Sequence, residues 1–301
     1  MGQSLADASP AATAVFTAAD EALGERLTGL CFSGPPEQLD LTANAQPAIL
    51  ATSIAYLHAW QAAAGDEVPA ADFYAGHSMG QYSAMVAAGV LSLADGLRLV
   101  RERGRQMQSS AEDGAMAAII GLADDRIAQI VSAGEEVGVF TVANRNSPGQ
   151  IVVSGGRAAV ERASEVAREL GAKRAIVLPV SVAAHSPLMS SAADGMRAVL
   201  AGVSFADPTA PLLANADARR LTTGDECRAE LVEHLTRGVD WVAAVERMAA
   251  DGVDRFVEIG PGKVLTGLIK RIAPDIDSHA LDDQSAPARL ALPTPATGVA
   301  S

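Results

Sequence analysis

Apolar residues recur at helical spacing through the first hundred residues of the chain. Small and apolar positions predict a helix between Asp7 and Leu27, and a longer one from Pro47, placed in its first turn, to Ala64. The segment from Gln81 to Gly89 is typical of a short buried helix. Ser92 then begins an amphipathic helix that reaches about Gln108. We expect several of its arginines outside and these residues inside: Leu93, Leu97, Val100 and Met107.

After Gly114 the pattern alternates between short apolar strands and helices. The predicted strands are Met116–Leu122, Val137–Ala143, Gln150–Ser154 and Lys173–Val182, with a turn at Asn146–Gly149. The predicted helices are Asp125–Ala133 and Ala158–Leu170. This β-α-β-β-α-β order is typical of a ferredoxin-like unit. We therefore expect an α/β protein in which residues 114–183 form a small inserted domain and residues 1–113 and 184–281 form the core.

Composition narrows the class of protein. The chain has 301 residues, 49% of them hydrophobic, and a net charge of −13, which predicts a globular protein and disfavours nucleic-acid binding. Two cysteines, Cys31 and Cys227, are too few for a disulfide framework. The sequence has no signal-peptide pattern and no apolar run typical of a membrane span. We expect a cytoplasmic monomer without contact to membranes, and a disordered tail over residues 282–301.

The clearest chemical signal is a candidate nucleophile. The strand-like run Asp72–Ala75 leads into Gly76-His77-Ser78-Met79-Gly80, which matches G-x-S-x-G and precedes a predicted helix. Such a turn holds the serine in a strained backbone, and we expect a side chain at either glycine to collide with its neighbours. The N–H of Met79 at the helix start is placed to stabilise an oxyanion. A glycine-rich turn with a merely structural serine is the alternative.

A serine nucleophile needs a base, and the chain has five histidines. His58 lies within a helix, His77 is inside the turn, and His279 lies near the tail. His185 follows a predicted strand and precedes a helix, the position where catalytic groups gather in α/β sheets. Position alone therefore favours His185, although a structural histidine in a loop is the alternative.

Seven segments together resemble one family. They are Gln46–Leu50, Gly76–Ser83, Arg103–Gln108, Gly114–Gly121, Asn146–Gln150, Val180–His185 and Glu258–Gly267. In this order they resemble the malonyl-CoA:acyl carrier protein transacylases, from Met1 to about Ile272. The resemblance implies an α/β-hydrolase-like core with the ferredoxin-like insertion, and transfer of a malonyl group through a serine ester. It implies malonyl-CoA and acyl carrier protein as partners, and no cofactor or metal.

The resemblance also assigns roles to residues. Ser78 is the nucleophile and His185 its base, whose second ring nitrogen donates to the backbone carbonyl of His234, where the family often has glutamine. Arg103 is implied to bind the malonyl carboxylate, because a guanidinium holds a carboxylate in a bidentate way. Spacing alone would not select it from the other arginines of its helix, Arg98, Arg101 and Arg105. Gln46 and Asn146 match polar residues near the pocket.

Other features leave alternatives open. The family normally begins with a strand ending in Phe-Pro-Gly-Gln-Gly-Ser-Gln, which supplies a second oxyanion amide, and this sequence starts just after it. Either the natural protein is longer, which the other intact motifs favour, or the chain is truncated. For a truncated chain we expect an exposed sheet edge and weaker catalysis. Gly260–Lys263 is not a Walker A motif, and a helix-start turn is favoured over a phosphate site. Because carrier proteins of this family are acidic, docking requires local basic residues. The candidates are Lys173, Arg174, Lys263, Lys270 and Arg271.

Three other functions compete with malonyl transfer to carrier protein in fatty-acid synthesis. A serine hydrolase would use the same turn but needs no carboxylate-binding arginine. A trans-acting polyketide acyltransferase would use another extender unit, and the small residues Ala183 and Ala184 lie where such enzymes select it. A non-catalytic carrier-protein binder would form no acyl-serine.

Overall fold

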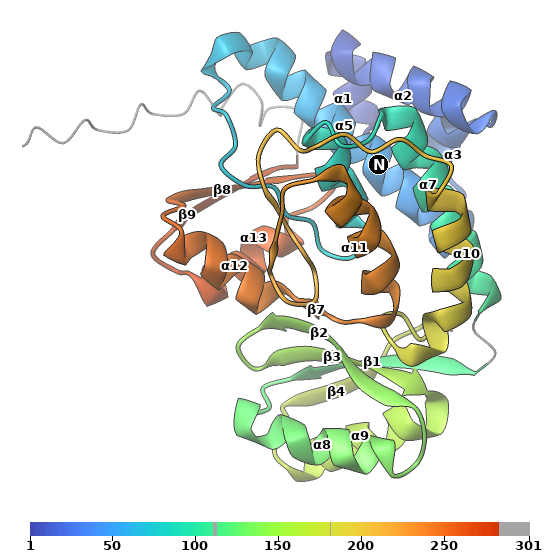
Figure 1. The fold of residues 1–301 in the computed structure, drawn as a ribbon, viewed down its shortest axis with the longest axis vertical. Coiled ribbons are helices and arrows are strands. Elements are labelled where there is room, and N and C mark those ends of the chain that lie inside the picture. The colour runs from blue at the N-terminus through green and yellow to red at the C-terminus, as the bar shows by residue number, and fades with distance from the viewer. Residues whose placement is uncertain (111–112, 181, 283–301) are drawn as a thin grey trace, which may run out of the picture.

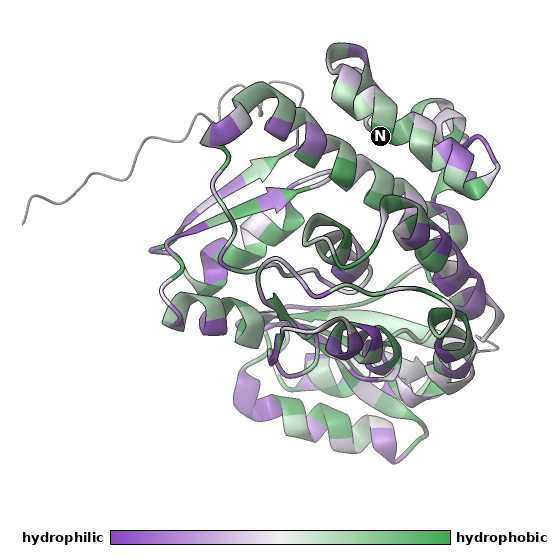
Figure 2. Cartoon of the chain, turned by 45° about the horizontal axis from the view of Figure 1, so that its top comes forward, coloured by the Kyte–Doolittle hydropathy of each residue, from purple (hydrophilic) through white to green (hydrophobic). Residues whose placement is uncertain are grey.

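The computed structural model describes residues 1–110, 113–180 and 182–282, so the predicted tail lies almost entirely outside the described residues. The N-terminal region is helical, and α2, α5 and α7 pack against one another. Figure 2 shows hydrophobic and hydrophilic residues alternating along the outer helices, as expected of helices with one face packed against the molecule. No helix in the described part of the chain is long and apolar enough to cross a membrane. The helices of this region are α1 (Gln3–Ala8), α2 (Pro10–Leu23), α3 (Leu27–Ser33), α4 (Pro36–Leu39), α5 (Thr42–Ala64), α6 (Gly80–Ala87) and α7 (Leu93–Ser109).

The predicted start of the long helix is wrong, because α5 begins at Thr42 and Pro47 lies inside it. Proline has no N–H, so the carbonyl of Ala43 lacks its usual donor four residues on. Arg101 of α7 supplies that donor, with Nη1 2.7 Å from the Ala43 oxygen, and also pairs with Glu25. Arg101 is therefore a buried structural arginine, and the expectation that the arginines of α7 point outward fails for it.

The predicted β-α-β-β-α-β order between residues 114 and 177 is confirmed. Strands β1 to β4 form a sheet in the order β4-β1-β3-β2, antiparallel throughout, and β7 (Val239–Asp240) joins it in parallel to β2. Helices α8 and α9 cover the face that points away from the rest of the molecule (Figure 1). The elements are β1 (Gly114–Ile120), α8 (Ile127–Glu135), β2 (Phe140–Ser147), β3 (Gln150–Gly156), α9 (Arg157–Glu169) and β4 (Arg174–Val177).

Two predicted boundaries in this sheet are wrong. Strand β2 continues to Ser147, so Asn146 lies in a strand and the turn is confined to Pro148 and Gly149. Gly149 adopts φ +69°, which lets the tight turn form there. Strand β4 ends at Val177, well before the predicted Val182. The longer strand that brings Asn146 inward places its side chain toward the larger part of the molecule.

The C-terminal region returns to the larger part of the molecule. The predicted strand Asp72–Ala75 is reduced to one parallel bridge between Tyr74 and Leu212. The remaining strands form two short pairs, β5 with β6 and β8 with β9. A separate apolar cluster includes Leu213 and Phe256 of these strands together with Trp241. The elements are α10 (Ser190–Leu200), β5 (Leu212–Leu213), β6 (Arg220–Leu221), α11 (Gly224–Thr236), α12 (Trp241–Ala250), β8 (Arg255–Ile259), α13 (Val264–Ile272) and β9 (Asp277–Leu281).

Candidate active site

A sharp turn between Tyr74 and α6 presents Ser78. Ser78 has φ +54°, in the left-handed region, as expected for a strained nucleophile turn. A Cβ at Gly76 would lie 2.1 Å from the backbone of Gly80, so only glycine fits there. At Gly80 itself a Cβ would meet nothing within 4 Å, so the expected collision at the second glycine is wrong.

Ser78 and His185 lie within hydrogen-bond distance. Ser78 Oγ is 2.8 Å from His185 Nε2, although 107 residues separate the two in sequence. The other ring nitrogen, Nδ1, donates to the backbone carbonyl of His234 at 2.5 Å and lies 3.2 Å from that of Arg237. These carbonyls at the end of α11 fix the tautomer, because a proton held on Nδ1 leaves Nε2 free to accept from serine. The arrangement is a dyad supported by backbone oxygen.

The electrostatic environment keeps His185 uncharged. The side chain is buried, and burial, with the nearby charge of Arg103 second, lowers the pKa of His185 to about 3. A neutral imidazole at pH 7 is the form that can accept the serine proton. His185 can therefore act as a general base across the physiological range.

Arg103 reaches the same atom from α7. Its side chain is 1% exposed, its Nη2 lies 3.1 Å from Ser78 Oγ, and its Nη1 donates to Gln46 Oε1 at 2.7 Å. Within residues 1–110, 113–180 and 182–282, no carboxylate pairs with it. Arginine stays protonated in proteins, and a buried cation needs a counter-charge. The structure thus places an unneutralised cation beside the nucleophile.

The remaining predicted residues, Met79, Gln46 and Asn146, each have a different place in the site. Met79 lies at the start of α6, and its N–H donates to no acceptor in the described part of the chain, so it is free to bind an oxyanion. Gln46 orients Arg103 and also contacts the sulfur of Met107. Asn146 does not reach Ser78; its Oδ1 lies 2.9 Å from Nε2 of His77 instead. Asn146 therefore connects strand β2 to the nucleophile turn.

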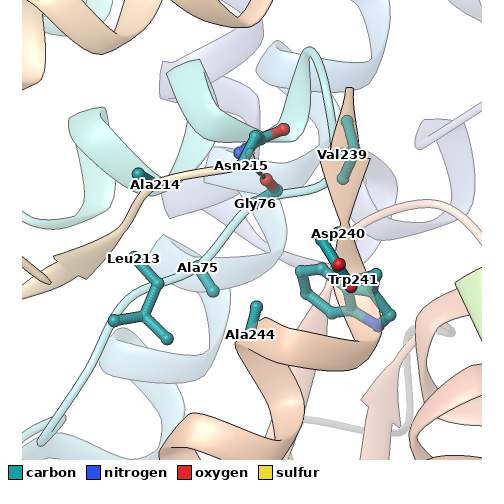
Figure 3. Close-up of a pocket in the computed structure, with 9 residues that line it drawn as sticks. All are labelled: Ala75, Gly76, Leu213, Ala214, Asn215, Val239, Asp240, Trp241 and Ala244. Carbon is teal, nitrogen blue, oxygen red and sulfur yellow. Dashed lines mark hydrogen bonds between the residues drawn. The ribbon is translucent and has the colours of Figure 1, made fainter. Parts of the chain in front are cut away.

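Sequence reasoning missed Asn215, which holds that turn from behind. Asn215 Oδ1 accepts the N–H of Ser78 at 2.8 Å, and its Nδ2 donates to the carbonyl of Gly76 at 2.9 Å. Figure 3 shows Asn215 directly against Gly76, on the wall of a narrow, mostly apolar pocket that also includes Trp241. The signal was present in the sequence, since Asn215 follows the apolar run Pro211–Ala214 at a strand end.

The segment Gly260–Lys263 is a helix-start turn, as predicted. Helix α13 begins at Val264, and Glu258 accepts the N–H groups of Leu265 at 3.0 Å and Thr266 at 2.6 Å. A carboxylate already occupies the donors that a phosphate would use. The structure gives no support to a phosphate site there.

The site combines a strained serine, a neutral histidine, a free helix-start amide and an unneutralised arginine. These groups fit the transfer of an acyl group to and from the serine. The acyl transferase domain family matches residues 1–283, and the chain belongs to this family. Its resemblance to the malonyl-CoA:acyl carrier protein transacylases is confirmed by the relatives described next.

Three comparisons illustrate the similarity. The malonyl CoA-acyl carrier protein transacylase of Escherichia coli K12 is 46% identical over 279 residues, which cover 92% of this chain and 89% of that protein. The crystal structure of the acyl-carrier-protein S-malonyltransferase of Bartonella henselae aligns with a TM-score of 0.91 at 42% identity, covering 97% and 94% of the two chains. A malonyl-transacylase solved in complex with a type II PKS acyl-carrier protein aligns with a TM-score of 0.88 at 40% identity, covering 95% and 92% of the two chains.

Proposed function

We propose that this chain transfers a malonyl group from malonyl-CoA to the phosphopantetheine thiol of acyl carrier protein, in fatty-acid synthesis. The observation that carries the proposal is Arg103, a buried cation 3.1 Å from Ser78 Oγ with no acidic partner among the described residues. In malonyl-CoA a single methylene separates the free carboxylate from the thioester carbonyl. A carboxylate bound by Arg103 therefore brings that carbonyl close to Ser78, which favours a short diacid over a longer or uncharged acyl group.

The reaction proceeds in two matched halves. His185 Nε2 takes the proton of Ser78 Oγ as that oxygen attacks the thioester carbon, and the N–H of Met79 stabilises the oxyanion. The tetrahedral intermediate releases coenzyme A thiolate, which takes the proton from His185. The carrier-protein thiol then loses its proton to His185 and attacks the malonyl-serine ester, and the proton returns to Ser78 as it leaves. No step requires a metal or a bound cofactor.

Intact mass spectrometry after brief exposure to malonyl-CoA tests the proposal. We expect one malonyl group on the unmodified chain and none on Ser78→Ala. Arg103→Ala should lose the malonyl adduct while still accepting an acyl group from an uncharged acyl-CoA. A chain that hydrolyses malonyl-CoA but never passes the group to a thiol would support the serine hydrolase. A chain that binds carrier protein and forms no acyl-serine would support the non-catalytic binder.

A polyketide acyltransferase is the second candidate, favoured by the structural similarity to a malonyl-transacylase that was solved with a type II PKS acyl-carrier protein. Ala183 and Ala184, beside His185, are small and buried. Offering malonyl-CoA and methylmalonyl-CoA together separates the candidates, since the adduct masses differ by one methylene. We expect the malonyl adduct to dominate.

We also propose how the parts of the chain are used. An α/β-hydrolase-like core (1–113 and 184–281) holds the dyad, and a ferredoxin-like small domain (114–183) closes one side of the site through Asn146. The protein acts as a cytoplasmic monomer that binds neither membranes nor nucleic acid. The exposed side chain of Lys173 lies against Gly121, which follows β1. Arg271 donates to Gln150, the first residue of β3. These two cations lie on the face that we propose for docking the acidic carrier protein, together with Arg174, Lys263 and Lys270.

A further inference from the structure

One buried carboxylate connects the Ser78 turn with the helix that orients His185. Glu230 lies on α11 with 1% of its surface exposed, and its Oε1 accepts the backbone N–H of Asn215 at 2.7 Å. We propose that ionised Glu230 is a positioning residue that fixes the Ser78 turn relative to His185. This inference rests on the proposed acyl transfer at Ser78.

The link to Ser78 runs through Asn215. The side chain of Asn215 makes the two hydrogen bonds to the turn described above and a third, 3.1 Å long, to Gln81 Oε1. Because Ser78 has a strained backbone, bonds from outside the turn must hold it in place. Glu230 in turn holds Asn215 by accepting its backbone N–H. A shift of the Glu230 carboxylate therefore moves Asn215, which supports the Ser78 turn.

The link to His185 runs through α11 itself. Glu230 lies one helical turn before His234, whose carbonyl accepts from Nδ1 of His185. The same helix therefore carries the acceptor that orients the base and the carboxylate that holds the nucleophile turn. The 2.8 Å approach of Ser78 Oγ to His185 Nε2 depends on both contacts together.

The charge of Glu230 sets the strength of this link. Its Oε2 lies 3.6 Å from Arg219 Nη2 and has no hydrogen-bond partner within the described residues. Burial raises the pKa of Glu230 to about 7, while the Asn215 N–H and Arg219 favour the ionised form. An ionised acceptor makes the stronger hydrogen bond. The charged and titratable groups around Glu230 are Asp217 and Arg219 between β5 and β6, Cys227, Glu233 and His234 on α11, and Arg237 after it.

The rate at which Ser78 reacts should therefore change near pH 7, and the ionisation of its base, His185, should not be the cause. His185 has its pKa near 3 and stays neutral from pH 6 to 8, so its ionisation does not change over that range. Glu230 goes from mostly protonated to mostly ionised over the same range. The wild-type rate should rise about tenfold between pH 6 and 8, following the ionised fraction of Glu230.

The test measures labelling of Ser78 by a fluorophosphonate, a reagent that needs an activated serine but no malonyl group. We expect Glu230→Gln, which keeps an oxygen acceptor for Asn215 but cannot ionise, to react at a rate that is flat between pH 6 and 8. Glu230→Ala should react at least tenfold more slowly at pH 8. Glu233→Gln is the matched control, because Glu233 also pairs with Arg219 but does not contact Asn215. It should keep the rise with pH, displaced to slightly lower pH because the charge of Glu233 helps to raise the pKa of Glu230.

A flat wild-type rate, or a Glu230→Gln variant that keeps the rise near pH 7, would overturn the proposal. A rise that disappears in Glu233→Gln as well would overturn it too, because the effect would then belong to the surface ion pairs. Malonyl-CoA labelling run in parallel keeps the two proposals distinguishable. Fluorophosphonate labelling without a malonyl adduct rejects the proposed substrate alone, and absence of both labels rejects both proposals.

Discussion

At the scale of single residues, Arg101 and Arg103 show how two neighbouring buried arginines differ in purpose. Arg101 is neutralised by Glu25 and donates to the free carbonyl of Ala43, so its charge and donors are used within the fold. The partners of Arg103 in the described part of the chain are all neutral: Gln46, Ser78 and the ring of Tyr82. A buried cation without a counter-ion is unfavourable for stability, which is expected where a ligand supplies the missing charge.

Replacing Arg103 should therefore affect the charged substrate selectively. We expect Arg103→Ala to lower kcat/KM for malonyl transfer roughly 100-fold, which corresponds to about 3 kcal/mol from a buried charge-assisted interaction. Arg105→Ala on the same helix is the control, because Arg105 is exposed and pairs with Glu102 on the same helix. Steady-state rates with malonyl-CoA and acetyl-CoA measure the effect. An equal loss with both substrates would contradict a role in carboxylate binding.

At the scale of elements, close packing of α7 against α5 places Arg103. A Cβ at Gly104 would lie 2.5 Å from the Cα of Ala43 and 2.8 Å from the carbonyl of Thr42, so the two helices approach as closely as their backbones allow. Arg103 is adjacent to this contact, and Gln46 faces it from α5. The distance from the guanidinium to Ser78 is thus set by a helix pair whose spacing requires glycine.

The substitution Gly104→Ala tests this spacing. Alanine usually stabilises a helix interior by up to about 1 kcal/mol relative to glycine, but here its methyl would meet backbone that cannot move without separating the helices. We expect a net loss of about 1–3 kcal/mol, measured as a lower urea midpoint, together with slower acylation of Ser78. Gly267→Ala in α13 has open space around the new methyl and should be neutral or stabilising. A stabilised Gly104→Ala would contradict the close contact.

The sequence and the family resemblance predicted the nucleophile turn, its base and Arg103, and missed the contacts that support them. The nucleophile turn follows from glycine spacing and a strand-to-helix context, and the resemblance supplied Arg103. The burial of Arg101 was not predictable, because it depends on a helix start five residues before Pro47 and a carbonyl 58 residues from the arginine. The contact between Glu230 and Asn215 was equally hidden, because one glutamate among the several charged residues of α11 gives no local sign that it is buried.

At the scale of the whole molecule, three histidines around the site contribute to the pH dependence of stability in acid. The pKa values of His77, His185 and His234 are all lowered by burial below the unfolded value of 6.5, that of His185 to about 3. The unfolded chain therefore binds more protons below pH 6.5, so these histidines contribute stability above that pH and the contribution is lost as pH falls. Glu230 acts oppositely: its raised pKa gives stability that is complete below about pH 4.5 and is lost as pH rises through about 7.

Replacing His234 separates the effect of the histidines on acid stability from their effect on catalysis. His234 supports His185 through its backbone carbonyl, so His234→Gln should keep acylation of Ser78 within a few-fold. The variant should lose one titrating group, which reduces the slope of unfolding free energy between pH 6 and 4 by about 1.4 kcal/mol per pH unit. Urea unfolding across that range measures the slope, with the exposed His58→Gln as the control. An unchanged slope would mean that His234 is protonated in the folded protein, which its complete burial beside His185 and Arg103 disfavours.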